Sequence, residues 1–165
     1  MNDAAELSRE LRTESTPDLA RRRGIVALSL VASASMGVIA LYQMGLLKHL
    51  PEPRLPIFDA DRVDASAEAY KRFSTPDAIL GFGSHAATMG LAAMGGSDRA
   101  RKAPWIPLAL AAKVGFDVAN AARLTVVQWK QHRAFCLWCL IAASATFAMA
   151  PLVICETKNA FQALP

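Results

Sequence analysis

The sequence predicts an all-α protein, specifically an integral membrane four-helix bundle. Hydrophobic residues make up 53% of the 165-residue chain and the mean hydropathy is +0.25, which is more apolar than a soluble domain of this size usually is. Four apolar stretches are long enough to cross a hydrocarbon core of about 30 Å as helices. They lie at about residues 24–47, 77–96, 104–128 and 134–155. We therefore expect an N-terminal tail (1–23), one membrane domain (24–156) and a C-terminal tail (157–165).

The first span follows three arginines, Arg21–Arg23, and residues 24–47 contain no charged side chain. A basic flank before an apolar run is also typical of a signal peptide, and the Ala-Ser-Ala of residues 32–34 resembles a cleavage site. The apolar run continues well past that motif. This continuation favours a retained membrane helix over a cleaved signal.

The segment 48–76 between the first two spans is charged and contains four prolines, which argue against one long helix. Asp64 or Ser66 could cap a short helix that runs through Phe73 and lies on the membrane surface. An irregular loop is the alternative.

The second and third spans carry signals of helix packing inside a membrane. Residues 77–96 are rich in glycine, alanine, serine and threonine, and small residues allow membrane helices to approach closely. The span 104–128 begins with Pro104, a favourable first helical residue. Lys113 and Asp117 are four residues apart and so share one face of this helix. Because charges at membrane depth are costly, we expect either a paired structural contact or a functional role.

The fourth span, 134–155, follows a turn at residues 129–133 that contains an aromatic anchor, Trp129. Pro151 lies inside this span. A proline at that position kinks a helix or ends it early.

Basic residues beside the spans predict the orientation. With four spans, Arg21–Arg23 and Arg99–Lys102 lie on the same side of the membrane as both tails, and we expect that side to be cytosolic. The 48–76 loop and the 129–133 turn would then face the periplasm from the bacterial inner (cytoplasmic) membrane. Five basic residues in this loop make the charge bias incomplete. No aromatic residues interleave with the basic blocks, so we expect no nucleic-acid partner.

Two of the three cysteines, Cys136 and Cys139, form a Cys-x-x-Cys pair at the outer end of the fourth span. This is the spacing of a reversible dithiol, and disulfides persist in the periplasm. A helix N-terminus stabilises a thiolate on the first cysteine. The nearby basic side chains Lys130, His132 and Arg133 act in the same direction. An interfacial turn residue is the alternative interpretation of His132. We predict that Cys136 and Cys139 are catalytic.

Other uses of the pair fit the sequence less well. A structural zinc site needs four ligands, and Cys155 lies about 28 Å from Cys136 along a helix. Attachment of haem needs a histidine where Leu140 stands. We expect no metal. Two buried cysteines that act as small apolar residues remain an alternative, and Cys155 is expected to be inert.

A membrane dithiol needs an electron donor or acceptor, and a quinone in the bilayer is the natural one. Its pocket would be apolar with a few polar groups for the carbonyl oxygens. Asp77 at the outer end of the second span and His85, roughly 12 Å deeper, are candidates. Asp77 could instead cap its helix, and His85 could be satisfied by a neighbouring helix.

The chain resembles the vitamin K epoxide reductase family. The resemblance is carried by "FCLWCL" at the start of the fourth span and by "TPDAILGFGSHAATMGLA" around the second. The order of one span, a long outer loop and three further spans is also similar. The resemblance extends over about residues 24–150.

The resemblance implies a four-helix membrane bundle around a quinone, either ubiquinone or menaquinone, whose chemistry is coupled to thiol–disulfide exchange. By this resemblance, Cys139 would react with the quinone and Cys136 would exchange disulfides with a separate thioredoxin-like periplasmic thiol protein. Four residues of the second span would form the quinone-binding wall: Asp77, Leu80, Gly81 and His85.

Two features depart from the family pattern. The family usually carries a second cysteine pair in the first outer loop, and residues 48–76 contain none. The family's aromatic hydroxyl one turn after the second cysteine is replaced by Ala143. We therefore also consider a non-catalytic membrane protein on the same bundle, which would bind quinone or lipid or act as an assembly factor.

Overall fold

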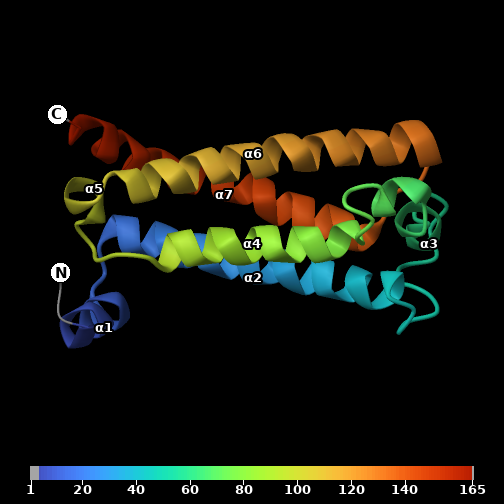
Figure 1. Ribbon diagram of the computed structural model, residues 1–165, viewed down its shortest axis with the longest axis horizontal. Coiled ribbons are helices and arrows are strands. Elements are labelled where there is room, and N and C mark those ends of the chain that lie inside the picture. Colours follow the sequence, from blue (N-terminus) through green and yellow to red (C-terminus); the bar gives the residue numbers. More distant parts are fainter. Residues whose placement is uncertain (1–3, 165) are drawn as a thin grey trace.

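The computed structural model describes residues 4–164, and four long helices lie side by side in it (Figure 1). They are α2 (Pro17–Gln43), α4 (Asp77–Ala93), α6 (Trp105–Val127) and α7 (Leu137–Gln162). Helix α2 packs along both α4 and α7, and α7 packs along α6, whereas α4 and α6 contact each other less. The predicted all-α class is confirmed.

Short helices close the two ends of this bundle (Figure 1). At the end that holds both termini lie α1 (Ala4–Thr13) and α5 (Arg99–Lys102). At the opposite end lie α3 (Ala60–Asp64), the 3₁₀ turn η1 (Ala67–Tyr70) and the π-helical turn η2 (Gln128–His132). The predicted outer loop and outer turn therefore lie together at the end away from the termini.

Helix α2 begins and ends earlier than the predicted span 24–47. Thr16 caps it, because its Oγ1 accepts a hydrogen bond of 3.2 Å from Leu19 N, and Pro17 occupies the first helical position, where proline is favoured. The helix ends at Gln43, and Gly45 takes a positive φ of 77°. Much of the predicted tail is thus helical, since α1 and the first turns of α2 fall within it.

The other three helices follow the predicted spans more closely at one end than at the other. Helix α6 matches the span 104–128 to within one residue at each end. Helix α4 begins at Asp77 as expected but ends at Ala93, where Gly95 has a φ of 80°. Helix α7 continues through Pro151 to Gln162, so the alternative that this proline ends the helix is wrong.

The outer loop contains a short helix at a different place from the predicted one. Asp59 caps α3 by accepting a hydrogen bond from Arg62 N, so Asp64 is not a cap but the last residue of α3. Ser66 precedes η1 without a side-chain capping bond, and Phe73 lies beyond η1 and is 88% exposed. The predicted turn at 129–133 largely coincides with η2, after which Arg133 takes a left-handed conformation.

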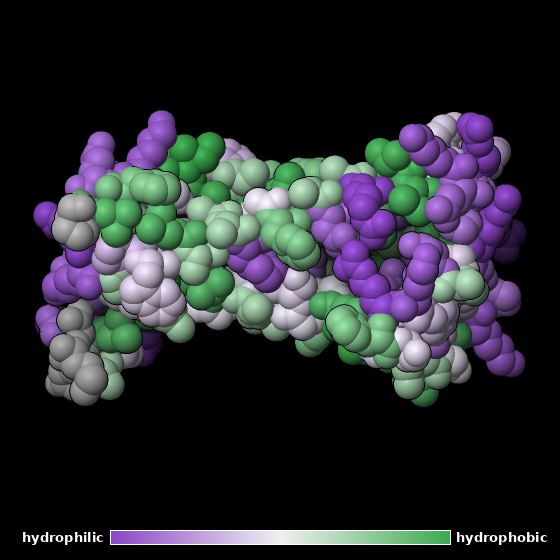
Figure 2. All heavy atoms as spheres, turned by 45° about the horizontal axis from the view of Figure 1, so that its top comes forward, coloured by the Kyte–Doolittle hydropathy of each residue, from purple (hydrophilic) through white to green (hydrophobic). Residues whose placement is uncertain are grey.

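Within the described residues, two helices, α2 and α7, are long and apolar enough to cross a bilayer by length and composition. Helix α4 has 17 residues, which gives a length of about 26 Å, and α6 contains Lys113, Asp117 and Arg123. Figure 2 shows hydrophilic side chains gathered at both ends of the molecule and mostly hydrophobic ones over the narrower middle. This distribution matches a protein whose two ends lie in water and whose middle lies in lipid.

Small residues allow close packing in the middle of the bundle. Ala32 on α2 is buried against Ala142 and Ala145 on α7, as expected where membrane helices approach closely. Between α2 and α4, a Cβ on Gly81 would come within 2.7 Å of Met36 Sδ. A larger residue at position 81 would therefore require the Met36 side chain to move.

Candidate functional site

The two cysteines of the Cys-x-x-Cys pair sit at the first turn of α7. Cys136 is the N-cap residue, and its Sγ accepts a hydrogen bond of 3.1 Å from Cys139 N. The Cys136 N–H in turn donates to Gln128 Oε1 at 3.0 Å. The first sulfur therefore accepts a hydrogen bond from one of the N–H groups that a helix leaves unpaired at its N-terminus.

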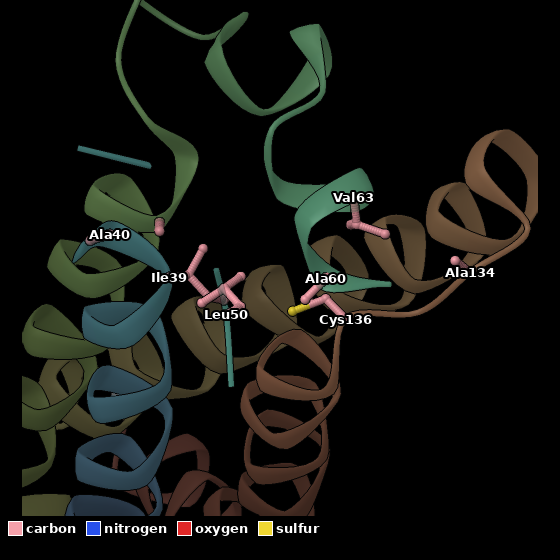
Figure 3. Packing of buried hydrophobic residues seen from close by; sticks show 8 residues of the cluster. Ile39, Ala40, Leu50, Ala60, Val63, Ala134 and Cys136 are labelled. Atoms are coloured by element: carbon pink, nitrogen blue, oxygen red, sulfur yellow. The ribbon is translucent and has the colours of Figure 1, made fainter. Parts of the chain in front are cut away.

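A layer from the outer loop covers Cys136. Its side chain is 0% exposed and packs in a cluster with Ile39, Leu50, Ala60 and Val63. Figure 3 shows the Cys136 sulfur next to Ala60 and Leu50. The first cysteine is thus closed to solvent on the side of the outer loop.

Three hydrogen bonds hold the outer loop over the dithiol. Phe135 N donates to Ile57 O at 2.8 Å, and Asp59 N donates to Phe135 O at 3.1 Å, which makes a single β-bridge. The indole Nε1 of Trp138, between the two cysteines in sequence, donates to Pro51 O at 2.9 Å. The segment from residue 51 to residue 59 is therefore anchored to the start of α7.

The carboxylate of Asp64 contacts the second cysteine. Cys139 Sγ lies 3.5 Å from Asp64 Oδ1, and the aspartate is only 3% exposed. Its second oxygen, Oδ2, is buried without a hydrogen-bond partner among the described residues. Burial raises the pKa of Asp64 to about 7, and the nearby carboxylates Asp77 and Glu52 act in the same direction because like charges disfavour ionisation.

Gln43, the last residue of α2, joins the elements around this site. Its Nε2 donates to Asp77 Oδ1 at 2.8 Å and to the backbone oxygen of Asp64 at 3.2 Å. Its Oε1 accepts from Ala78 N at 3.3 Å, and its own backbone oxygen accepts from Tyr70 Oη. One amide therefore sets the position of the start of α4 and of the end of α3.

A cavity of about 480 Å³ opens beside the second cysteine. Cys139 and Asp64 line it together with the four residues predicted as the quinone-binding wall, which are Asp77, Leu80, Gly81 and His85. Cys136 is not among the lining residues. The dithiol thus presents one sulfur to the cavity and keeps the other behind it.

The deeper wall of the cavity carries a polar cluster from α4 and α6. Lys113 Nζ lies 2.5 Å from Asp117 Oδ2 and donates to Ser84 Oγ at 2.7 Å. Thr88 Oγ1 also donates to Asp117 Oδ2, at 3.1 Å. The expected pairing of Lys113 with Asp117 is confirmed. His85 neighbours this cluster, and its Nδ1 is buried without a partner in the described part of the chain.

A scan against protein-family models matches the vitamin K epoxide reductase family over residues 24–154. The chain belongs to the vitamin K epoxide reductase family. A search of curated proteins finds no match, and neither does a search of solved structures. Proteins of this family are membrane-embedded oxidoreductases that generally act on quinone-type substrates together with thiol partners. Membership therefore indicates a membrane redox function.

The remaining residues considered from the sequence of this vitamin K epoxide reductase family member lie partly in the cavity and partly outside it. Ala143, which stands where an aromatic hydroxyl was expected, also lines the cavity. His132 lines it from η2, whereas Cys155 is exposed on a later turn of α7. Asp77 is the first helical residue of α4 rather than its N-cap, which is Pro76.

The ligand atoms of Asp64, Cys136 and Cys139 lie within 4.8 Å of one another, so they form a group of a size that could hold a metal ion. A closed structural zinc site requires four protein ligands. Within residues 4–164 this group has three.

Sequence analysis missed Asp64, Gln43 and Gln128 as parts of the site. A usable signal existed for Asp64, because Ala60, Val63 and Asp64 have the i, i+3, i+4 spacing of one helix face. Two apolar neighbours on that face indicate that the aspartate is buried with them. No comparable pattern marks the two glutamines, whose roles depend on contacts between distant segments.

Proposed function

We propose that this protein is a membrane thiol–disulfide oxidoreductase that couples the Cys136–Cys139 pair to a membrane quinone. The observation that carries the proposal is the position of Cys139 on the wall of a cavity of about 480 Å³. Pockets of this size commonly bind small organic molecules when apolar walls carry a few polar groups. Family membership supports the redox class of the reaction.

The two cysteines have different roles in this proposal. Cys139 lines the cavity and reacts with the quinone, whereas Cys136 lies behind it and exchanges disulfides with a protein partner. In the oxidising direction, two thiols become one disulfide and the quinone becomes a hydroquinone. Two electrons and two protons leave the sulfurs and end on the quinone, so the reaction is balanced.

The wall formed by Asp77, Leu80, Gly81 and His85 would hold the quinone ring. Leu80 and the bare backbone of Gly81 offer apolar contact, and Asp77 and His85 offer polar atoms for the carbonyl oxygens. The substrate would be ubiquinone or menaquinone.

We further propose that all four long helices span the bacterial inner membrane, with both termini in the cytosol and the dithiol at the periplasmic side. Two observations support this orientation. Arg21–Arg23 and α5 lie at the same end as the termini (Figure 1), and basic residues favour the cytosolic side. The covering loop and the dithiol lie together at the other end.

The partner would be a separate thioredoxin-like periplasmic thiol protein. Because Cys136 is covered, the partner reaches it only when the segment from residue 51 to residue 59 moves aside. The hydrogen bonds that hold this segment are few and lie at the edge of the bundle. Local opening of such a segment costs much less than global unfolding.

The first test is the redox state of the pair in cells. Thiols are trapped with acid and alkylated with a mass tag in quinone-replete and quinone-depleted cells. The proposal expects the pair to be oxidised only when quinone is present, in the wild type and in the control Cys155→Ser. A Cys139→Ser variant should accumulate a mixed disulfide between Cys136 and the partner.

A non-catalytic quinone or lipid binder, or an assembly factor, is the second candidate function. The complete burial of Cys136 favours it, as does the absence of cysteine from the 48–76 loop. A pair that stays reduced in both kinds of cell, together with normal function of Cys136→Ser and Cys139→Ser, would support this candidate and contradict the first.

A further inference from the structure

We propose that Asp64 is the base of the reaction: it takes the proton from the Cys139 thiol and delivers it to a quinone oxygen. This inference rests on the proposed quinone–thiol function. It assigns a catalytic role to a residue on α3, outside the predicted spans.

The contact between the two groups is the first support. Asp64 Oδ1 lies 3.5 Å from Cys139 Sγ, a hydrogen-bond distance for a sulfur donor, and such contacts tighten when substrate binds. The aspartate does not depend on the sulfur for its position. Its backbone oxygen is held by Gln43, and its helix is fixed by the Asp59 cap.

The free oxygen of the same carboxylate is the second support. Oδ2 is buried and has no partner among the described residues, and a buried polar atom without a partner is costly. Asp64 also lines the cavity that holds the proposed quinone site. One carboxylate oxygen therefore faces the proton donor, and the other is available to hand a proton to a substrate.

The groups around Asp64 keep its pKa near neutral pH. The groups that act on it are Glu52 from the outer loop, Asp77 from α4 and both thiols from α7. The two carboxylates and burial disfavour its charged form, whereas hydrogen bonds from the thiols favour it. With a pKa of about 7, the carboxyl both accepts and releases a proton near neutral pH.

The proton count fits two uses of the same carboxylate. Asp64 first takes the proton of Cys139 and passes it to one quinone oxygen as the Cys139 thiolate attacks a quinone carbon and forms a C–S bond. Cys136 Sγ then attacks Cys139 Sγ, so that the S–S bond forms, the C–S bond breaks and its electron pair stays on the hydroquinone. The proton of Cys136 goes to the second quinone oxygen. The sulfur of Cys136 is within the same 4.8 Å group, so Asp64 can serve both steps.

The test is a single-turnover assay on the purified full-length protein, reduced beforehand and mixed with a short-chain ubiquinone analogue at pH values between about 5 and 9. In the wild type, the rate should rise with pH as Asp64 loses its proton near pH 7. In Asp64→Asn, the rate at neutral pH should fall at least tenfold. It should rise only at alkaline pH, where the thiols themselves ionise.

The matched control is Asp59→Asn, which removes the same charge from the N-cap of the same helix. Asparagine caps a helix about as well as aspartate, and within the described part of the chain Asp59 makes no hydrogen bond to either cysteine. This control should keep the wild-type rate and pH profile. An Asp64→Asn profile equal to that of the control would overturn the inference.

Two further outcomes are decided in the same experiment. If the wild type does not reduce the quinone analogue, the proposed function fails, and this inference fails with it. If Asp64→Asn does not fold, as judged by circular dichroism, Asp64→Glu is measured in its place. This variant keeps the carboxylate but moves it relative to Cys139. A slower rate that still rises near neutral pH supports Asp64 as the base, whereas an unchanged rate contradicts that role.

Discussion

The two ends of the bundle bury charged groups in opposite ways. At the end with the termini, Arg99 makes a two-point contact with Glu156, at 2.6 and 2.7 Å. Arg22 donates there to the backbone oxygens of Ala92, Gly95 and Gly96, all within 2.9 Å. At the dithiol end, Asp64 has a thiol beside one oxygen, and its other oxygen has no hydrogen-bond partner among residues 4–164.

This difference shows which end is built for stability. Every orphan carbonyl that a helix leaves at its C-terminus needs a partner, and the two arginines supply partners to the last turn of α4. The dithiol end keeps a buried carboxylate incompletely satisfied. Such local cost is expected at functional sites, where it is balanced by stability elsewhere in the molecule.

The largest effect should come from breaking the paired charges at the end with the termini. Glu156→Gln keeps the shape of the side chain but leaves Arg99 buried without its counter-charge. We expect a loss of about 3–5 kcal/mol in the free energy of unfolding, measured by denaturation of the detergent-solubilised protein. The exposed Glu14→Gln is the control. A loss in Glu156→Gln as small as in this control would refute the contrast between the two ends.

Arg22 offers the second test at the same end. Arg22→Met keeps the aliphatic length and removes all of its hydrogen bonds to the end of α4. We expect a loss of about 2–3 kcal/mol, because buried carbonyls then lack donors. Arg22→Lys should recover only part of this loss, since a single ammonium cannot span the same carbonyls. A stability of Arg22→Lys equal to that of the wild type would show that charge alone matters there.

At the dithiol end, removal of the charge should stabilise the protein. The pKa of Asp64 is raised from 3.8 to about 7 on folding, so the folded state binds more protons. Stability therefore falls as pH rises from about 4 to about 7. Asp64→Asn removes this dependence, and we expect it to be more stable than the wild type by about 1–2 kcal/mol above pH 7.

The measurement is the melting temperature of both proteins across that pH range. The advantage of Asp64→Asn should shrink as the pH falls towards 4 and vanish at lower pH, where the carboxyl of the unfolded wild type is protonated as well. A constant difference at all pH values would mean that the charge of Asp64 has no special cost.

The smallest effect concerns the cover over Cys136. Trp138→Phe removes the hydrogen bond to Pro51 O, a bond worth about 0.5–1.5 kcal/mol. The outer loop should then open more often, and alkylation of Cys136 should speed up by about two- to tenfold. Trp105→Phe, at the opposite end, is the control. Unchanged alkylation would mean that the β-bridge at Phe135 alone holds the loop closed.

Helix positions were predictable to different degrees, for identifiable reasons. The bounds of α6 follow from Pro104 and from the polar turn after Val127, both of which are local signals. The end of α7 was missed because Pro151 is compatible with a continued helix in this bundle. The start of α2 was missed because the charged residues before Gly24 hide a capped helix in which Arg22 is buried.

The functional site was likewise predictable where the signals are local and not where they depend on packing. The Cys-x-x-Cys spacing and its place at a helix start were readable along the chain, as was the placement of Asp77 and His85 on one helix that leads inward. Their shared cavity with Cys139 depends on how α4, α6 and α7 pack. The role proposed for Asp64 depends on the outer loop, which contacts α7 from more than 70 residues away.

By itself, the sequence determined the helical class, the apolar character of the long helices and the dithiol at the head of the last one. These properties depend on residue type and on spacing within one helix, and both are local. The tertiary structure alone decided which sulfur meets the cavity, which is covered by the loop and which carboxylate lies against the thiol. Those choices depend on contacts between segments far apart in the chain, where side-chain packing and the need to satisfy buried polar groups select one arrangement.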